Sequence, residues 1–243
     1  TNMLFRAFLA AFAVIVITFS PVAAVTDGEL DGDGHPYVGL MVAQDADGNP
    51  MWRCSGTLLS EWLFITAGHC TYGAAHVEIW FDSDVESGIP DNGYPYTGDV
   101  GGTPNTYPGY ENGPFYISDV GIVVLDSAYP SPTGEYGVLP EAGALDYLGR
   151  QRGKHDMWFT AVGYGLQASF PDAASWKNQA ERVRMVSYPG LIQINNGIVG
   201  EYSLLLTNNA NSGGTCFGDS GGPNFIQNTS IIATIIKTII TRY

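Results

Sequence analysis

Three observations predict an all-β protein. Short apolar runs rich in β-branched or aromatic residues recur along the chain, and clusters of turn-forming residues separate them. Sustained helical periodicity is almost absent, although residues 141–148 are compatible with one or two helical turns. The chain has 243 residues, of which 45% are hydrophobic, so it can bury a sizeable core in one large domain or two small ones.

The expected strands follow one another along the whole chain. Turn-rich segments separate them, for example Asp45–Pro50 and Pro90–Gly93. Residues 129–134 carry two prolines, which cannot sit in a central ladder, and are predicted to form a linker. The predicted strands are Val38–Ala43, Leu63–Ala67, Val77–Phe81, Val120–Leu125, Trp158–Val162, Arg182–Tyr188, Ser203–Thr207 and Ile231–Ile240.

Residues 1–24 have the composition of a signal peptide. Arg6 is their only charge, a long apolar run covers 4–19, and small residues end the segment at Ala24. A membrane anchor is the alternative, since the run is nearly long enough to span a bilayer. The small residues favour cleavage after Ala24, so we expect a secreted, extracellular protein with no stable membrane association after the signal is removed.

The charge balance excludes one class of partner. Apart from Arg6, the chain carries 9 basic side chains against 24 acidic ones, and its formal net charge is −14. A field of that sign repels phosphate backbones, so we expect no nucleic-acid partner. Solubility of a secreted protein is a sufficient reason for the acidic excess.

The residues from Gly218 to Pro223 form a glycine-flanked turn around one hydroxyl, in the order Gly-Asp-Ser-Gly-Gly-Pro. The turn also matches the nucleophile elbow of α/β-hydrolases, in which an acid and then a histidine follow the serine. No Asp, Glu or His follows Ser220, so that interpretation fails. A serine nucleophile needs a base and an orienting group, and here both must lie upstream.

Upstream candidates occur in the order His, Asp, Ser. His69 lies in the segment Thr-Ala-Gly-His-Cys, and Asp119 begins the apolar run Asp-Val-Gly-Ile-Val-Val-Leu. Together with the Ser220 turn and Cys54–Leu59, these motifs resemble the chymotrypsin/trypsin-like serine protease family from about residue 25 to just past Pro223. Residues 236–238 stand where the family has a Ser-aromatic-Gly run, and there the resemblance ends.

The resemblance implies two antiparallel β-barrels with the active site in the cleft between them. Residues 25–134 would form the N-terminal barrel with His69 and Asp119, and residues 135–243 the C-terminal barrel with Ser220. The sequence stops at Tyr243, before the family's last strand and C-terminal helix, and this leaves open whether the second barrel is complete. The implied activity is that of a secreted serine endopeptidase working through an acyl-enzyme, with a protein or peptide as substrate.

The family also implies a role for each site residue. Ser220 would attack the scissile carbonyl, His69 would transfer the proton, and Asp119 would hold His69. The N–H groups of Gly218 and Ser220 would form the oxyanion hole. Asp219 would pair with a new N-terminal ammonium, which cleavage after Ala24 would create at Val25; a longer mature chain that needs another protease is the alternative.

Two further expectations come from the resemblance. The family pairs the cysteines that match Cys54 and Cys70 in a disulfide, whereas its partner for Cys216 lies on a later strand and no later cysteine exists here. The altered C-terminal region supports a rival hypothesis, a catalytically impaired homologue that acts as a binding or scaffold protein.

In the family that the chain resembles, substrate preference depends on the residue six before the nucleophile, which here is Gly214. Because this residue is not an acid, a pocket formed with Thr215 and Phe217 favours small or apolar side chains over Lys or Arg. We expect a monomer with no cofactor and no metal. Two acidic segments resemble calcium loops, but solvated acids are the simpler interpretation of both.

Overall fold

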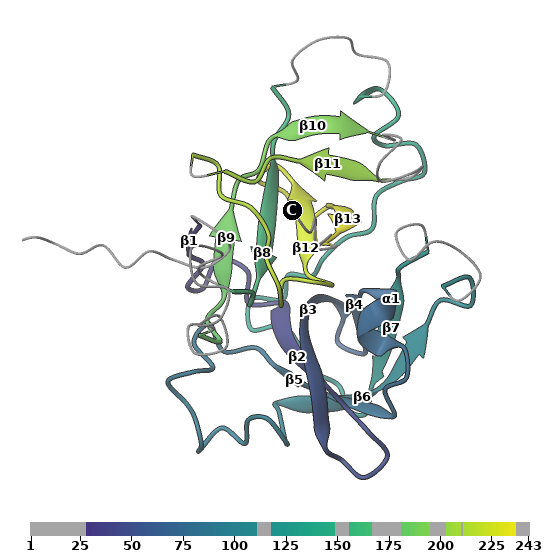
Figure 1. The fold of residues 1–243 in the computed structure, drawn as a ribbon, viewed down its shortest axis with the longest axis vertical. Coiled ribbons are helices and arrows are strands. Elements are labelled where there is room, and N and C mark those ends of the chain that lie inside the picture. The colour runs from purple at the N-terminus through teal and green to yellow at the C-terminus, as the bar shows by residue number, and fades with distance from the viewer. Residues whose placement is uncertain are drawn as a thin grey trace, which may run out of the picture.

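A computed structural model describes residues 28–110, 118–148, 156–166, 181–194, 203–209 and 211–236, and these residues are nearly all β-structure (Figure 1). Six antiparallel strands close into a barrel in the order β2-β3-β4-β7-β6-β5. Their bounds are β2 Val38–Gln44, β3 Pro50–Ser60, β4 Leu63–Thr66, β5 His76–Trp80, β6 Val100–Thr106 and β7 Gly121–Leu125.

Four strands from the second half of the chain, together with β1, build a separate five-stranded sheet in the order β1-β9-β8-β12-β13, with a small β10-β11 pair beside it. Figure 1 shows the closed barrel below and the teal, green and yellow strands of the second half above it. The strands are β1 Glu29–Leu30, β8 Phe159–Gly163, β9 Met185–Ser187, β10 Leu191–Ile194, β11 Leu204–Leu206, β12 Pro223–Ile226 and β13 Ile232–Ile235. The fold is therefore all-β with two halves, as the sequence predicted.

β2 is buried on both faces. All seven of its residues are buried, because Val38, Met41 and Ala43 pack in the main core, whereas Leu40 and Val42 pack in a second cluster with Trp80, Val85 and Tyr164. One apolar core continues from this barrel into the second sheet, where it includes Val162, Val186 and Phe225. The two halves are consequently packed as one body.

One stretch crosses between the halves. Although β1 precedes the first barrel in the sequence, Glu29 and Leu30 pair with Val186 and Met185 of β9 in the second sheet. The start of the described chain is thus attached to the half that carries Ser220. The domain boundary at residue 134 stays a prediction.

Most expected strands are present within one or two residues, and the differences have local causes. The expected strand at Ile231–Ile240 is observed as β13 up to Ile235, and residues 237–240 lie outside the described ranges. Residues 141–148 form consecutive tight turns, with N–H groups bonded to carbonyls three residues earlier. Within the described ranges, no helix has the length and apolar character needed to cross a membrane.

Candidate active site

His69 and Asp119 meet because two barrel strands deliver them to the same place. β4 leads into the short helix α1, Gly68–Thr71, which carries His69, while Asp119 lies just before β7. β4 and β7 pair with Thr66 opposite Gly121, so the ends of the two segments are neighbours. The register of the barrel therefore brings together two residues that are 50 positions apart.

The Asp119 carboxylate holds both the backbone and the ring of His69. The His69 N–H donates to Asp119 Oδ1 at 2.7 Å, and Nδ1 lies 2.8 Å from Oδ2. Asp119 is buried, whereas a third of the His69 side chain is exposed. A carboxylate at Nδ1 favours the tautomer with the proton there, which leaves Nε2 as the basic nitrogen.

A disulfide fixes the histidine segment to the barrel. Cys54 on β3 and Cys70 on α1 are bonded, which confirms the predicted pair. Nearby, the Trp52 indole N–H donates to the Cys70 carbonyl at 3.0 Å. The short α1 turn is thus held on β3 by a covalent bond and a hydrogen bond.

The turn around Ser220 has a backbone that only glycine adopts readily. Gly218 and Gly221 have φ values of +96° and +87°, in the left-handed region. A Cβ at Gly221 would lie 2.1 Å from Thr66 Oγ1 and 2.3 Å from the Ser55 carbonyl oxygen. Both the conformation and the close approach of β3 and β4 therefore require glycine at position 221.

Ser220 lies against the segment that carries His69. The Ser55 N–H donates to the Ser220 carbonyl at 2.8 Å, and Cys70 Sγ is 3.7 Å from the same oxygen. Since Cys70 follows His69 directly, the structure brings the serine turn of the second half to the histidine segment of the first. All three predicted triad residues thus come from segments that are in contact.

The turn also presents two backbone donors. Among the hydrogen bonds between described residues, none uses the N–H of Gly218 or of Ser220. These N–H groups belong to the two residues predicted to form the oxyanion hole. They are available to a ligand oxygen.

Asp219 is fully buried beneath this turn. Its carboxylate accepts the N–H of Gly165 at 2.7 Å and of Cys216 at 2.8 Å. Burial raises the pKa of Asp219 to about 7, although these two N–H groups and the Arg53 guanidinium act in the opposite direction. Its expected partner, Val25, lies outside the described residues.

The predicted substrate pocket is described only in part. Gly214 is buried, and a Cβ there would lie 2.2 Å from Asn208 Oδ1, while Asn208 Nδ2 donates to the Thr215 carbonyl at 3.2 Å. Phe217 is 45% exposed. Asn208 is thus a polar neighbour of Gly214 that the sequence interpretation did not identify, since no motif includes it.

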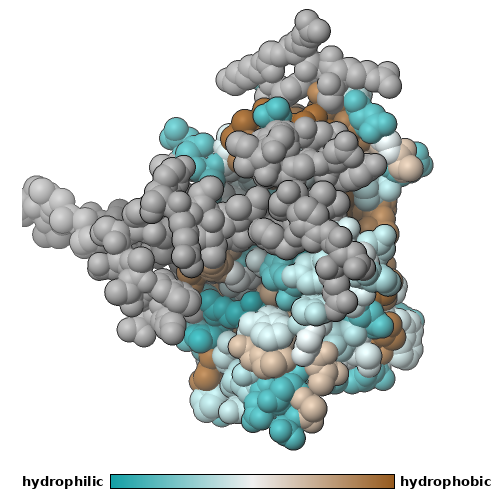
Figure 2. Space-filling view, turned by 45° about the vertical axis from the view of Figure 1, so that its right-hand side comes forward, coloured by the Kyte–Doolittle hydropathy of each residue, from teal (hydrophilic) through white to brown (hydrophobic). Residues whose placement is uncertain are grey.

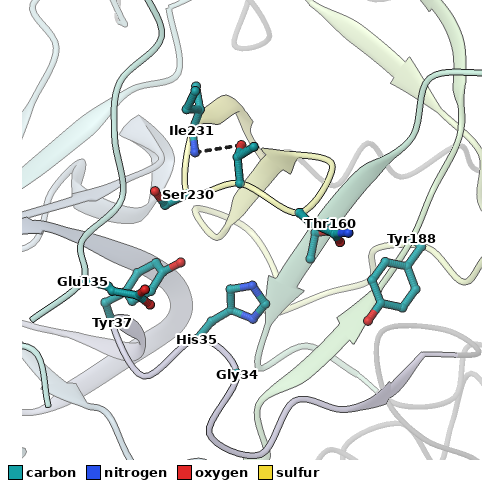
Figure 3. A pocket seen from close by; sticks show the side chains of 10 residues that line it. Gly34, His35, Tyr37, Glu135, Thr160, Tyr188, Ser230 and Ile231 are labelled. Carbon is teal, nitrogen blue, oxygen red and sulfur yellow. Dashed lines mark hydrogen bonds between the residues drawn. The ribbon is translucent and has the colours of Figure 1, made fainter. Parts of the chain in front are cut away.

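The structure also contains a candidate metal-binding group and a further pocket. Among the described residues, the one group with metal-ligand spacing is Cys54, His69 and Cys70, but its two sulfurs are joined in the disulfide and cannot serve as thiolate ligands. A polar pocket occurs where the first residues of the described chain meet the second sheet (Figure 3). It is lined by Gly34, His35, Tyr37, Glu135, Thr160, Tyr188 and residues 228–231, and contains none of the triad residues.

Comparison with known proteins decides the family. The family model described as Trypsin matches residues 32–240. The chain belongs to the trypsin family. It is a trypsin-like serine protease by family, which implies hydrolysis of protein or peptide substrates.

Solved structures agree with the fold. A structure titled "HL collagenase" superposes with a TM-score of 0.65 over 89% of this chain and 87% of that chain, at 19% sequence identity. At that identity the match shows the chymotrypsin-like two-barrel fold and nothing finer. No curated protein sequence matches the chain.

The family member described here has a mixed surface. In Figure 2, the described surface of the first barrel combines teal and pale residues with small tan groups, while the darkest brown residues lie along its margins.

Proposed function

We propose that this trypsin-family member is a secreted serine endopeptidase that works through Ser220, His69 and Asp119. The observation that carries the proposal is the bond pattern of Asp119, which accepts both the backbone N–H and the Nδ1 of His69. This arrangement fixes the ring and leaves Nε2 to take a proton from a hydroxyl. Ser220 supplies that hydroxyl from the adjoining turn.

The proposed reaction has two halves. Ser220 Oγ attacks the peptide carbonyl while His69 Nε2 takes the proton of the Ser220 hydroxyl. The carbonyl oxygen becomes negative and accepts hydrogen bonds from the N–H groups of Gly218 and Ser220. His69 then returns the proton to the leaving amine, and an acyl-enzyme forms at Ser220. Water attacks the acyl group with the same base, which releases the acid and restores Ser220.

Secretion and activation belong to the same proposal. The apolar leader would be removed after Ala24, and the ammonium of Val25 would then pair with Asp219. Support comes from Asp219 itself, a fully buried carboxylate with a raised pKa, which an approaching cation would stabilise in its charged form. We further propose that the protein is a monomer and prefers small or apolar residues before the cut.

Peptide hydrolysis by triad variants tests the proposal. Ser220→Ala and His69→Ala should each lower kcat on a peptide amide by orders of magnitude without unfolding the protein. The double variant should lose little more than either single variant, because both residues act in one proton-transfer unit. Losses that multiply in the double variant would contradict a shared mechanism.

A further inference from the structure

Ser55 connects the serine turn to the first barrel through its backbone N–H and its hydroxyl. Its N–H donates to the Ser220 carbonyl at 2.8 Å, and its hydroxyl donates to the Gly218 carbonyl at 2.8 Å. The same hydroxyl accepts the Tyr164 N–H at 2.9 Å, while the Ser55 carbonyl accepts the Thr66 hydroxyl at 2.8 Å. The residue is completely buried, so water does not compete for these bonds.

Only part of this pattern needs a serine. Any residue on β3 could make the backbone bond to Ser220, but the two bonds of the hydroxyl require a side chain that donates and accepts at once. The hydroxyl therefore adds a contact to Gly218 that the strand alone would not provide. Gly218 is also the residue that supplies one of the two available N–H donors.

Gly218 has a particular need for such a contact. With φ at +96° and no side chain, its backbone has little intrinsic preference for one conformation. A bond to its carbonyl restricts rotation about ψ, which sets how the Gly218 N–H lies relative to the next peptide units. Together with the backbone bond to the Ser220 carbonyl, Ser55 holds both ends of the Gly218–Ser220 segment.

We propose that the Ser55 hydroxyl is a positioning group that keeps the Gly218 and Ser220 N–H groups directed at one point. The inference rests on the proposed hydrolysis through Ser220, and it deepens that function. Ser55 touches neither substrate nor reacting atoms, so it acts through Gly218. Because negative charge develops on the substrate oxygen in the transition state, the effect falls on kcat rather than on substrate binding.

The test compares Ser55→Ala with a matched control. Ser187→Ala also removes a buried hydroxyl, but Ser187 Oγ has no hydrogen-bond partner among the described residues. For each protein, kcat and KM are measured on a peptide amide, and Kd is measured for a peptide boronate whose tetrahedral adduct with Ser220 places an oxygen at the two N–H groups. Unfolding by urea reports the folded fraction.

Ser55→Ala should lower kcat roughly 10- to 100-fold, somewhat less than the loss expected when an oxyanion donor is deleted outright. KM should stay within about twofold, and boronate affinity should fall by about the same factor as kcat/KM. Ser187→Ala should leave all three values near those of the wild type. Ser55→Thr retains a hydroxyl and should recover part of the lost kcat.

A purely structural role predicts different results. Two results with folded Ser55→Ala would overturn the inference while the proposed function stands. One is a kcat within twofold of the wild-type value. The other is an equal loss of substrate affinity and boronate affinity with kcat unchanged. If the wild type neither hydrolyses the peptide nor binds the boronate, the proposed function fails and the inference falls with it. Should Ser55→Ala not fold, Ser55→Cys fills the same space with a thiol that donates and accepts only weakly, and it is judged by the same kcat criterion.

Discussion

Asp119 and Asp219 are both buried acids in the site, but their hydrogen-bond partners differ, and so do the roles that we propose for them. Asp119 binds His69 through the backbone N–H and the ring, whereas among the described residues Asp219 accepts the backbone N–H groups of Gly165 and Cys216. A buried carboxylate without a bonded cation favours its neutral form. The raised pKa of Asp219 follows from this difference.

A pH-dependent stability should reveal the raised pKa of Asp219. In a chain that still carries residues 1–24, the folded protein binds a proton at Asp219 up to a pH of about 7, while the unfolded chain releases it near 3.8. Protonation of Asp219 therefore stabilises the folded state by about 4 kcal/mol below pH 3.8. This contribution to the free energy of unfolding is lost as the pH rises to about 7. Urea unfolding of the wild type and of Asp219→Asn is measured at several pH values. The free energy of unfolding of the wild type minus that of the variant should fall as the pH rises over this range.

A chain that begins at Val25 provides the comparison. If its ammonium pairs with Asp219, the folded-state pKa drops, and the fall in stability between pH 4 and 7 should disappear or reverse. If the stability difference between the wild type and Asp219→Asn did not depend on pH in the longer chain, the raised pKa would be contradicted. If this difference fell equally with pH in both chains, the proposed pairing would be contradicted.

Among the elements, α1 depends most on outside support. A helix of four residues has almost no stability of its own, so the disulfide and the Asp119 bonds must hold His69 in place. The Cys54–Cys70 bond closes a loop with a sequence separation of 16. A loop of about that length is worth about 3 kcal/mol in the chain-entropy model.

The double variant Cys54→Ala/Cys70→Ala should therefore be about 3 kcal/mol less stable than the wild type in urea unfolding. Its kcat should also fall in conditions where it remains fully folded, because α1 loses its covalent link to β3. A variant that loses stability but keeps full kcat would show that the Asp119 bonds suffice to position His69.

Sequence patterns predicted the strands that alternate or are uniformly apolar and missed those that are not. β6 contains two adjacent glycines and Pro104, a composition that normally argues against a strand. Pro104 is tolerated because β6 pairs there with β7 alone; its pairing with β5 covers only Val100–Gly102. β1 was missed because two residues carry no periodicity.

The site shows the same division. Motifs predicted His69, Asp119 and Ser220 as catalytic residues, because each is surrounded by residues that the turn or strand requires; their catalytic roles stay a prediction. Ser55 lay within a recognised motif, yet its role depends on bonds to residues more than 100 positions away, which no local pattern encodes. Asn208 depends in the same way on its contact with Gly214.

At the scale of the whole molecule, a buried Arg184 joins the two halves. From the residue before β9 it reaches Asp31 at 2.8 Å and donates to the carbonyls of Val38 and Phe81 in the first barrel. Both charged side chains of the ion pair are almost completely buried. Without Arg184, the buried Asp31 carboxylate would keep only the backbone N–H and Nδ1 of His35 among its described side-chain bonds and would lose its guanidinium partner.

Arg184→Met should consequently destabilise the protein by about 3–5 kcal/mol in urea unfolding. Arg182→Met is the matched control, two residues away, because Arg182 lies over the Tyr94 ring and pairs with Glu86 in a partly exposed position, with 28% and 40% of the two paired side chains exposed. That change should cost about 1 kcal/mol or less. Equal losses in the two variants would contradict the role of Arg184 in joining the halves.

Labelling of Ser220 tests the central claim most directly. A peptidyl phosphonate reacts with an activated serine, and peptide mapping by mass spectrometry then locates the adduct. The proposed mechanism predicts one adduct per molecule, on Ser220, strongly slowed in His69→Ala and absent in Ser220→Ala. A folded wild-type protein that stays unlabelled, or carries the adduct on another residue, would contradict it.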